Sequence, residues 1–494
     1  MAQVTQIATS DKKIAGVLPE HRDLYYDGKW QKPLGGYSET WNPATGASLG
    51  RAAEANAEDV DAAARAAHKA FREWRKTKPL DRAALLKKAA AALREHADEL
   101  GMLDAANCGN PVKEMLSDAR VAAVQIEYFA GLVTEIKGYT QPMGEGVVNM
   151  TIRQPYGVCA RITAYNHPLM FTAGKIGAPL AAGNTVIMKP PPQAPLSAYR
   201  MMELLDGIFP PGVLNMVTGG RECGEAVVAH PLIPMVTLIG SVPTGRAIAK
   251  GAGERLKHTI FELGGKNALV VYPDADLKRA VKGAVSGMNF TWCGQSCGST
   301  SRLFIHEQVY DQVLAGVVEE AKRFKPGIPT EMETTMGAIV SKAQWDKIMS
   351  YIELGKKEGA RLVAGGKAPD DPRLAKGFFV EPTIFADVTM AMRIAKEEIF
   401  GPVLSVIKWR DEEEMFEQVN SVEYGLTGSI YTSSLANAHR AASRLESGFI
   451  WVNNSGAHFL GVPFGGYKQS GIGREESIDE LLSFTQMKNI NITL

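Results

Sequence analysis

The chain has 494 residues and equal numbers of basic and acidic side chains, 54 of each, so its formal net charge is zero. This length predicts two or three domains, because single hydrophobic cores rarely grow so large. Nucleic-acid binding is disfavoured because it usually requires a basic excess. A membrane span is disfavoured because no apolar run approaches about 20 residues. The first residues lack the apolar segment of a secretory signal, so we expect a cytoplasmic protein.

In the N-terminal third, apolar residues recur at helical spacing. Val60, Ala63, Ala67 and Phe71 mark one amphipathic helix over 56–76, and a second is predicted over 80–107. The segment 138–157 has Gly and Pro at its ends and an alternating middle, which predicts an exposed hairpin. The C-terminal residues 481–494 have strand preference. Exposed strands often pair with another subunit, so both segments predict oligomerisation.

From residue 158 onwards, short apolar strands alternate with helices. Strands are predicted within 158–165, 184–190, 213–217, 235–240 and 258–265. Helices are predicted within 194–209, 219–230 and 244–256, and in a second α/β series after residue 266, at 310–324 and 341–360. This alternation predicts βαβ units and a parallel sheet covered on both faces. The fold class is therefore α/β.

The five cysteines are Cys108, Cys159, Cys223, Cys293 and Cys297. An odd number spread over a long chain disfavours a disulfide framework and favours a reducing compartment. Two thiolates four residues apart could supply two metal ligands on a helix, but no second pair and no H-E-x-x-H motif accompany them. We therefore expect no metal site.

Small residues surround the last cysteine in the stretch "NFTWCGQSCGSTSR". Glycines on both sides of Cys297 would let a substrate approach its sulfur. If a helix begins near Cys297, its dipole would lower the thiol pKa and favour the thiolate. The alternative is a small buried hydrophobe. Cys293, next to Trp292, has the character of a packed core thiol.

Two further polar residues follow predicted strands. Glu262, in "FELGGK", ends an apolar strand, where burial would raise its carboxyl pKa and suit it to general-base work. Alternatively, it pairs with Lys266. Asn166, in "AYNHP", could donate its amide N–H to an oxyanion. Alternatively, it caps the next helix.

No G-x-G-x-x-G follows any predicted strand, so the usual dinucleotide fingerprint is missing. The stretch "GSVPTGRA" places Gly240 and Gly245 at the interval of a phosphate loop. Arg246 and Ala247 stand where Lys and Ser or Thr would bind phosphate and magnesium, which disfavours nucleotide hydrolysis. The turn is either a plain βα connection or a pyrophosphate site at a helix N-terminus.

Taken in order, eight motifs resemble those of the aldehyde dehydrogenase superfamily. They are "AYNHP", "KPPPQAP", "GSVPTG", "FELGGK", "NFTWCGQSCGSTSR", "EEIFGPV", "YGLTGSIYT" and "PFGGYKQSGIGRE". The resemblance runs from about Trp41 to the C-terminus. It implies a modified Rossmann cofactor-binding domain over 1–136 and 155–262. A catalytic domain over 263–465 and a β oligomerisation arm over 137–154 and 480–494 would complete the fold.

The resemblance implies NAD- or NADP-dependent oxidation of an aldehyde to the acid. Cys297 matches the nucleophile, Glu262 the general base and Asn166 the oxyanion ligand, while Lys175 and Glu475 match a proton relay. Relatives that transfer the acyl group to coenzyme A generally lack this glutamate, so acylation is the alternative reaction. A non-catalytic descendant is disfavoured because Cys297 and Glu262 are both present.

The resemblance also implies cofactor and substrate contacts, with two departures from the family pattern. The implied cofactor residues are Lys189, Pro192, Gly220, Gly240, Ser241, Gly245, Leu263, Glu398 and Phe400. The implied substrate pocket comprises Phe171, Gly174, Ser296, His458 and Phe464. Pro192 replaces a glutamate that repels a 2′-phosphate in NAD-preferring relatives, and Arg221 is nearby, so NADP use is a hypothesis. Gly174 replaces a tryptophan that narrows the tunnel, which predicts a roomy, largely apolar pocket for bulky or aromatic aldehydes. The implied assembly is a homodimer or homotetramer.

Overall fold

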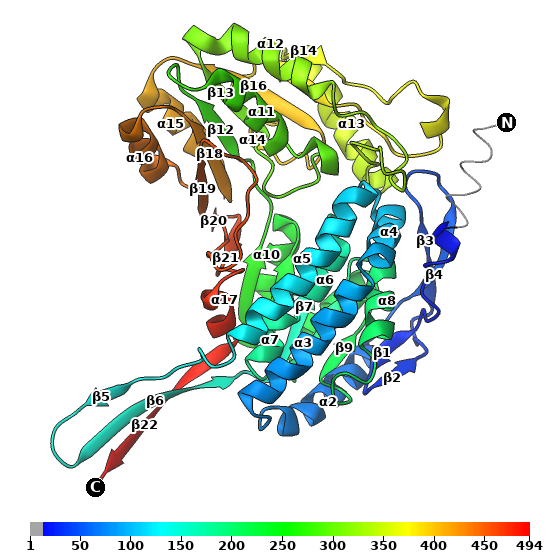
Figure 1. The fold of residues 1–494 in the computed structure, drawn as a ribbon, viewed down its shortest axis with the longest axis vertical. Helices are drawn as coiled ribbons and strands as arrows, with labels where there is room; N and C mark the ends of the chain where they lie inside the picture. The colour runs from blue at the N-terminus through cyan, green and yellow to red at the C-terminus, as the bar shows by residue number, and fades with distance from the viewer. Residues whose placement is uncertain (1–12) are drawn as a thin grey trace.

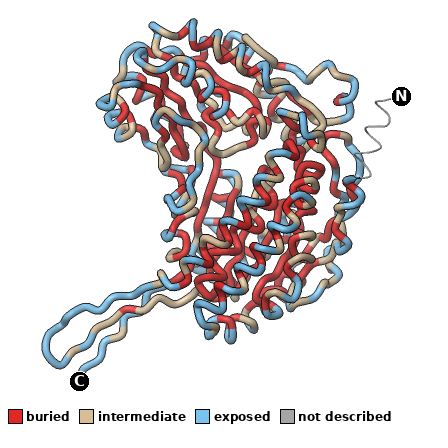
Figure 2. The backbone as a smooth tube through the Cα atoms, viewed as in Figure 1, coloured by how far each residue is buried: buried red, intermediate tan, exposed pale blue. Residues whose placement is uncertain are grey.

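A computed structural model describes residues 13–494, so the first 12 residues, including most of the segment tested for a secretory signal, lie outside the described chain. The chain forms two α/β lobes and a thin projecting arm (Figure 1). Red buried segments run through both lobes, whereas the arm is mostly exposed or half-buried (Figure 2). Within residues 13–494, no helix combines the length and apolar character needed to cross a bilayer.

The first lobe is built on an eight-stranded sheet with a parallel centre. In spatial order its strands are β2 (Lys29–Gln31), β1 (Leu24–Tyr26), β9 (Leu214–Met216), β8 (Thr185–Lys189), β7 (Val158–Ile162), β10 (Met235–Ile239), β11 (His258–Glu262) and β21 (Gly471–Ile472). The five central strands, β9, β8, β7, β10 and β11, run parallel, as the βαβ pattern predicts. The outer strands β1, β2 and β21 pair antiparallel.

Helices cover both faces of this sheet. One face carries α2 (Ala57–Trp74), α9 (Arg221–Ala229) and α10 (Val242–Gly253), and the other carries α3 (Pro79–Glu95), α4 (Ala97–Cys108), α5 (Val112–Gly131), α6 (Pro168–Gly174), α7 (Gly177–Ala181) and α8 (Leu196–Leu205). Successive residues of β7 enter opposite cores: Val158 and Ala160 pack beneath α2, and Cys159 packs beneath the other layer. The strands are therefore apolar throughout, because both faces are buried.

The prediction of one helix over 80–107 is wrong in one respect. The helix is interrupted at His96, whose backbone leaves the helical conformation (φ −102°, ψ 17°), and α4 begins at Ala97. Asp98 and Glu99 lie in the first turn of α4, where the helix dipole favours negative charge. This local charge pattern accounts for a new helix start that apolar periodicity alone does not reveal.

The second lobe contains a seven-stranded sheet. Its strands in spatial order are β14 (Arg361–Ala364), β15 (Thr383–Ala386), β16 (Val403–Trp409), β13 (Arg302–His306), β12 (Ala268–Val271), β18 (Thr427–Tyr431) and β19 (Phe449–Val452). The helices are α11 (Leu277–Gly287), α12 (Tyr310–Ala321), α13 (Lys342–Lys357), α14 (Arg393–Lys396), α15 (Glu412–Asn420) and α16 (Leu435–Arg444). All pairings except that of β14 are parallel. Two smaller sheets pair β3 (Tyr37–Trp41) with β4 (Ser48–Ala53) and β17 (Tyr424–Gly425) with β20 (Tyr467–Lys468).

The arm is a three-stranded antiparallel sheet that extends away from both lobes (Figure 1). Strand β6 (Val147–Pro155) lies between β5 (Thr140–Pro142) and the C-terminal β22 (Thr485–Thr493). The hairpin and terminal strand predicted from sequence are thus present. Residues 480–483, expected in the arm, instead complete helix α17 (Ile478–Ser483), because the Ser477 side chain caps its N-terminus and Glu480 is buried against the first lobe.

Candidate functional site

The loop that carries the candidate nucleophile lies between α11 and β13. Cys297 occupies a turn and is partly exposed, whereas Cys293 is fully buried, as its tryptophan neighbour predicts. All five cysteines are free thiols. Asn267, at the entrance to β12, holds the loop: its Nδ2 donates to the carbonyl oxygens of Cys297 (2.7 Å) and Ser299 (3.0 Å).

No helix begins near Cys297, so the condition for a dipole-lowered thiol pKa is not met. The short 3₁₀ turn Phe290–Trp292 ends before this residue, and the next regular element is β13. Burial, together with the carboxyl groups of Glu262 and Glu398, raises the pKa of the Cys297 thiol to about 12. Burial and these two carboxyl groups therefore favour the protonated form of the Cys297 thiol.

Glu262 lies at the end of β11, with 4% of its surface exposed. Within residues 13–494, neither carboxyl oxygen has a hydrogen-bond partner. Pairing with Lys266, the alternative considered from sequence, does not occur, since the Lys266 Nζ also lacks a partner there. Burial, and then the negative charge of Glu475, raises the Glu262 carboxyl pKa well above its usual range.

Asn166 lies in the turn between β7 and α6, with 4% of its surface exposed. The Asn110 Nδ2 donates to the backbone oxygen of Asn166 (2.7 Å) and fixes the turn from the α4–α5 connection. The capping alternative is wrong, because the residue at the N-cap of α6 is His167 and no side-chain capping bond forms. The Asn166 side chain therefore remains uncommitted to helix α6.

A buried charge cluster lies beside Glu262. The Lys175 Nζ is 2.9 Å from Glu475 Oε2, and the Arg161 Nη2 donates to Glu475 Oε1 (2.8 Å). Arg161 Nη1 also donates to Glu480 (3.2 Å). The charges of Lys175 and Glu475 both act on the Glu262 carboxyl pKa, so the cluster lies within electrostatic reach of that carboxyl group.

The turn after β10 leads directly into α10. Ser241 is the N-cap residue, and its Oγ accepts from the Thr244 backbone N–H (3.4 Å). The Gly240 N–H donates to the backbone oxygen of Glu262 (3.0 Å), which joins this turn to the end of β11. At Gly245, a Cβ would fall 2.7 Å from Leu263 Cδ1, so the absence of a side chain lets the Leu263 side chain pack directly against α10.

At the start of α9, a second set of predicted cofactor residues comes together. The buried Lys189 Nζ donates to the Gly219 carbonyl oxygen (2.6 Å), and the Gly220 N–H donates to Glu54 Oε2 (2.9 Å). Pro192 is exposed. Arg221, proposed to lie near a 2′-phosphate, has a 90% exposed side chain and donates instead to Glu225 (2.7 Å).

Glu398 and Phe400 approach the nucleophile loop from the second lobe. The Glu398 Oε1 accepts from the Gly265 N–H (3.0 Å). Glu398, Phe400 and Ser296 together line a water-sized cavity of about 10 Å³. Tyr165 packs edge-on against Phe400, with ring centroids 5.9 Å apart, so the Asn166 turn and the Phe400 segment are in contact.

The aromatic residues of the predicted pocket belong to two separate groups of ring contacts. His458 packs against Phe464 (4.8 Å between centroids) and stacks on Phe449 (5.9 Å), and Phe171 packs edge-on against His167 (5.2 Å). Part of the space that Gly174 opens in the predicted pocket is filled by a neighbouring side chain. A Cβ on Gly174 would fall 1.9 Å from the Gln125 Oε1, so the Gln125 carboxamide already occupies that space.

Sequence reasoning missed three residues at this site. Asn267 holds the Cys297 loop, Glu54 lies beside the Lys189 segment, and Gln125 faces Gly174. Asn267 follows "ELGGK" directly, so its proximity to the motif was an available signal. Glu54 and Gln125 lie in unrelated sequence contexts, and no local pattern could have joined them to the site.

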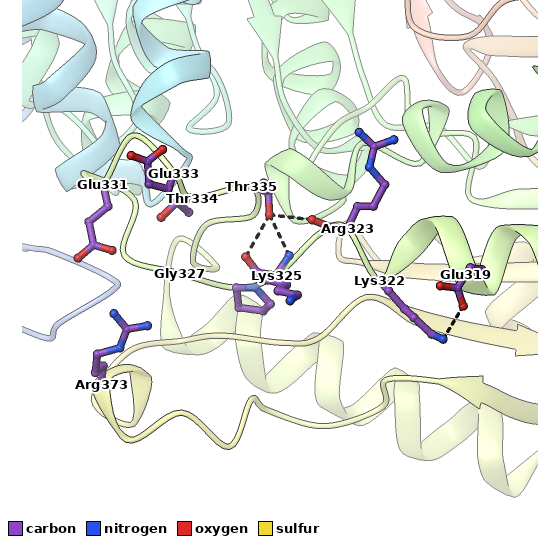
Figure 3. A pocket seen from close by; sticks show the side chains of 11 residues that line it. Glu319, Lys322, Arg323, Lys325, Gly327, Glu331, Glu333, Thr334, Thr335 and Arg373 are labelled. Carbon is purple, nitrogen blue, oxygen red and sulfur yellow. Dashed lines mark hydrogen bonds and ion pairs between the residues drawn. The ribbon is translucent and has the colours of Figure 1, made fainter.

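A larger surface hollow lies away from these residues. It measures about 620 Å³ and is formed beside α12 by the segment 322–335 and Arg373 (Figure 3). The Thr335 hydroxyl donates to the backbone oxygens of Arg323 and Lys325, and Lys322 forms an ion pair with Glu319 (2.5 Å). None of the predicted site residues lines this hollow, so its size carries no argument about the chemistry.

Two mostly parallel sheets with a projecting arm, and a thiol within electrostatic range of a buried carboxyl group, are the features of an oxidoreductase of the aldehyde dehydrogenase fold. A sequence profile of the aldehyde dehydrogenase family matches residues 30–490. The chain belongs to this family, and it is an aldehyde dehydrogenase enzyme.

Three similar proteins illustrate the relationship. Aldehyde dehydrogenase tropH of Talaromyces stipitatus is 52% identical over 489 residues, covering 97% of this chain and 95% of the relative. An aldehyde dehydrogenase from Bacillus cereus, solved as an NAD⁺ complex, superposes with a TM-score of 0.94 at 39% identity and 98% coverage of both chains. The indole-3-acetaldehyde dehydrogenase AldA of P. syringae, solved as a mutant in complex with NAD⁺ and IAA, has a TM-score of 0.95 at 33% identity and 99% coverage of both.

Proposed function

We propose that this enzyme oxidises a bulky or aromatic aldehyde to the carboxylic acid through a covalent thioester on Cys297, with NAD⁺ or NADP⁺ as oxidant. The observation that carries the proposal is that the Cys297 loop packs against the segment that follows Glu262. A Cβ on Gly265, three residues after Glu262, would fall 2.7 Å from the Cys297 backbone oxygen, and neither Glu262 carboxyl oxygen has a hydrogen-bond partner within residues 13–494. A nucleophile and an uncommitted base are the two groups that this chemistry needs.

The proposed steps use residues of this chain. The Cys297 sulfur, once deprotonated, adds to the aldehyde carbon, and the Asn166 side chain and the Cys297 backbone N–H stabilise the oxyanion that forms. A bound nicotinamide cofactor would supply the acceptor for the hydride that this carbon loses when the Cys297 adduct becomes the thioester. Glu262 then takes a proton from water as that water attacks the thioester, which releases the acid and regenerates the thiol. Lys175 and Glu475 would pass the proton away from Glu262.

The chain has groups that fit a nicotinamide dinucleotide. Ser241 and the first turn of α10 offer hydroxyl and N–H groups to a pyrophosphate. Lys189 and Glu398 would bind the two riboses, and at Gly264 a Cβ would fall 2.1 Å from the Glu398 Oε2. Glycine there lets the Glu398 carboxyl group lie directly against the backbone. We assign this role to the lobe of residues 1–136 and 155–262, and catalysis to 263–465.

The rings of Phe171, His458 and Phe464 would form an aromatic wall of the pocket, and they support a preference for aromatic aldehydes because flat rings stack favourably on such side chains. The likeness to an indole-3-acetaldehyde dehydrogenase supports the same class. A strong preference for acetaldehyde over benzaldehyde would contradict this substrate assignment.

The decisive experiment measures reduced-nicotinamide formation from benzaldehyde, with NAD⁺ and NADP⁺ compared, for the wild type, Cys297→Ala and the control Cys293→Ala. Turnover should vanish in Cys297→Ala and persist in Cys293→Ala. Persistence of turnover in Cys297→Ala would overturn the thiol mechanism. Production of an acyl thioester when coenzyme A is added would instead identify the acylating reaction as the true activity.

A further inference from the structure

Helices α5 and α6 pack along a seam with polar groups at both ends. At one end, the Asp118 Oδ2 lies 2.7 Å from the His167 Nδ1. At the other end, Gln125 faces Gly174, and the fit is so close that a Cβ on Gly174 would fall 1.9 Å from the Gln125 Oε1. The absence of a side chain at Gly174 is therefore what admits the Gln125 carboxamide.

This end of the seam adjoins the catalytic cluster. Gly174 directly precedes Lys175, which pairs with Glu475 at 2.9 Å and acts electrostatically on Glu262. One turn before Gly174, the Phe171 ring is partly exposed on the same helix. The Gln125 carboxamide therefore lies against the helix that carries Phe171 and leads into Lys175.

Gln125 is 6% exposed, and its Oε1 has no hydrogen-bond partner within residues 13–494. Burying an amide oxygen without a partner is unfavourable, and such a group in a native fold requires an explanation. If Gln125 only filled space, leucine would pack equally well in its place, because leucine has similar bulk and its side chain has no polar atoms. The Gln125 carboxamide is therefore available to a ligand.

We propose that Gln125 is a specificity-determining residue whose carboxamide hydrogen-bonds a hydroxyl group of the substrate. The substrate class is then a hydroxylated aromatic aldehyde: the ring stacks on the aromatic wall, and the hydroxyl donates to the Gln125 oxygen. A site built to bind a hydroxyl group discriminates against analogues that lack it, because its own polar group is then left unpaired. The inference rests on the proposed oxidation of aldehydes at Cys297.

The test compares kcat/KM for benzaldehyde with that for 3- and 4-hydroxybenzaldehyde in the wild type and in Gln125→Leu. We expect the wild type to favour at least one hydroxylated aldehyde, and Gln125→Leu to reduce that preference about tenfold, the value of one well-formed hydrogen bond. Gly174→Ala should reduce it similarly, since the new methyl group displaces the carboxamide. The control Glu127→Leu, on α5 where Glu127 pairs with Arg94, should leave the preference unchanged.

Binding to the Cys297→Ala protein provides a second measurement that needs no turnover. Calorimetry should show tighter binding of the favoured hydroxybenzaldehyde than of benzaldehyde, and Gln125→Leu should abolish the difference. An unchanged preference in both Gln125→Leu and Gly174→Ala would overturn the inference and leave the carboxamide hydrogen-bonded to water only. Failure of the wild type to oxidise any of the three aldehydes would instead count against the proposed substrate class.

Discussion

The Lys175 ammonium lies 2.9 Å from a carboxylate oxygen of Glu475, and each side chain is only 4% exposed. Arg161 binds the second oxygen of Glu475 and also reaches Glu480, so two positive and two negative charges balance in a buried cluster. Separating any one charge from the others would leave an unpaired ion away from water. The cluster therefore holds the β7 strand, α6 and the segment before α17 in one arrangement beside Glu262.

Glu480→Ala should destabilise the protein strongly. It leaves Arg161, 1% exposed, with a single carboxylate partner, and breaking a buried ion pair typically costs about 3–5 kcal/mol. Differential scanning calorimetry should show the melting temperature of the first lobe falling by several degrees. The control is Glu319→Ala, because its 2.5 Å pair with Lys322 is exposed and is expected to contribute at most about 1 kcal/mol. Equal shifts in both variants would contradict a structural role for the buried cluster.

Hydrolysis of the thioester should depend on pH through Glu262. Burial raises its carboxyl pKa well above the usual range, and a general base acts only when deprotonated. The steady-state rate should therefore increase as pH rises through this elevated pKa. Glu262→Gln should lose that rise and give a burst of about one reduced cofactor per subunit, followed by slow turnover. Multiple rapid turnovers by Glu262→Gln would show that another group serves as base.

Cofactor choice should depend on Glu54. Its carboxylate accepts the Gly220 N–H beside the Lys189 segment, where the adenosine ribose is proposed to bind. A negative charge there repels a 2′-phosphate, so Glu54→Gln should raise the ratio of NADP⁺ to NAD⁺ efficiency about tenfold, or ~1.4 kcal/mol. Glu58→Gln, at the exposed start of α2, is the matched control and should leave the ratio unchanged.

A substitution at Arg221 tests the alternative hypothesis, in which a positive charge at this position binds the 2′-phosphate of NADP⁺. Because its guanidinium binds Glu225 and is 90% exposed, Arg221→Ala should leave the NADP⁺ to NAD⁺ ratio unchanged. A selective loss of NADP⁺ activity in Arg221→Ala would establish it as a phosphate ligand and would contradict the inference drawn from its salt bridge.

The arm should mediate assembly of two or more subunits. Val148, Met487 and Ile492 are apolar and exposed on it, and covering such side chains with a second subunit is favourable. Ending the chain after Thr485 removes most of β22 and should reduce the particle mass measured by light scattering. Lys488→Ala, which keeps the strand, should leave the mass unchanged. A wild-type particle of monomer mass would rule out the oligomerisation hypothesis.

Local patterns accounted for much of the fold. The strands before Glu262 and Asn166, the hairpin of the arm and the terminal strand follow from periodicity and turn residues, which act over a few positions. The turn at Cys297 did not follow, because a run of small residues is compatible with either a turn or a helix start. Its conformation depends on hydrogen bonds from Asn267, which lies outside that run of small residues.

The sequence by itself determined the α/β class, the family and the chemical identity of the candidate groups, because the order of the motifs and the type of each residue are properties of the sequence alone. Only the tertiary structure decided the environment of those groups. It determined the raised thiol pKa of Cys297, the Glu262 carboxyl group that has no hydrogen-bond partner within residues 13–494, and the position of the Gln125 carboxamide beside Gly174. Burial and close contact between distant segments are properties of packing, and no short stretch of sequence encodes them.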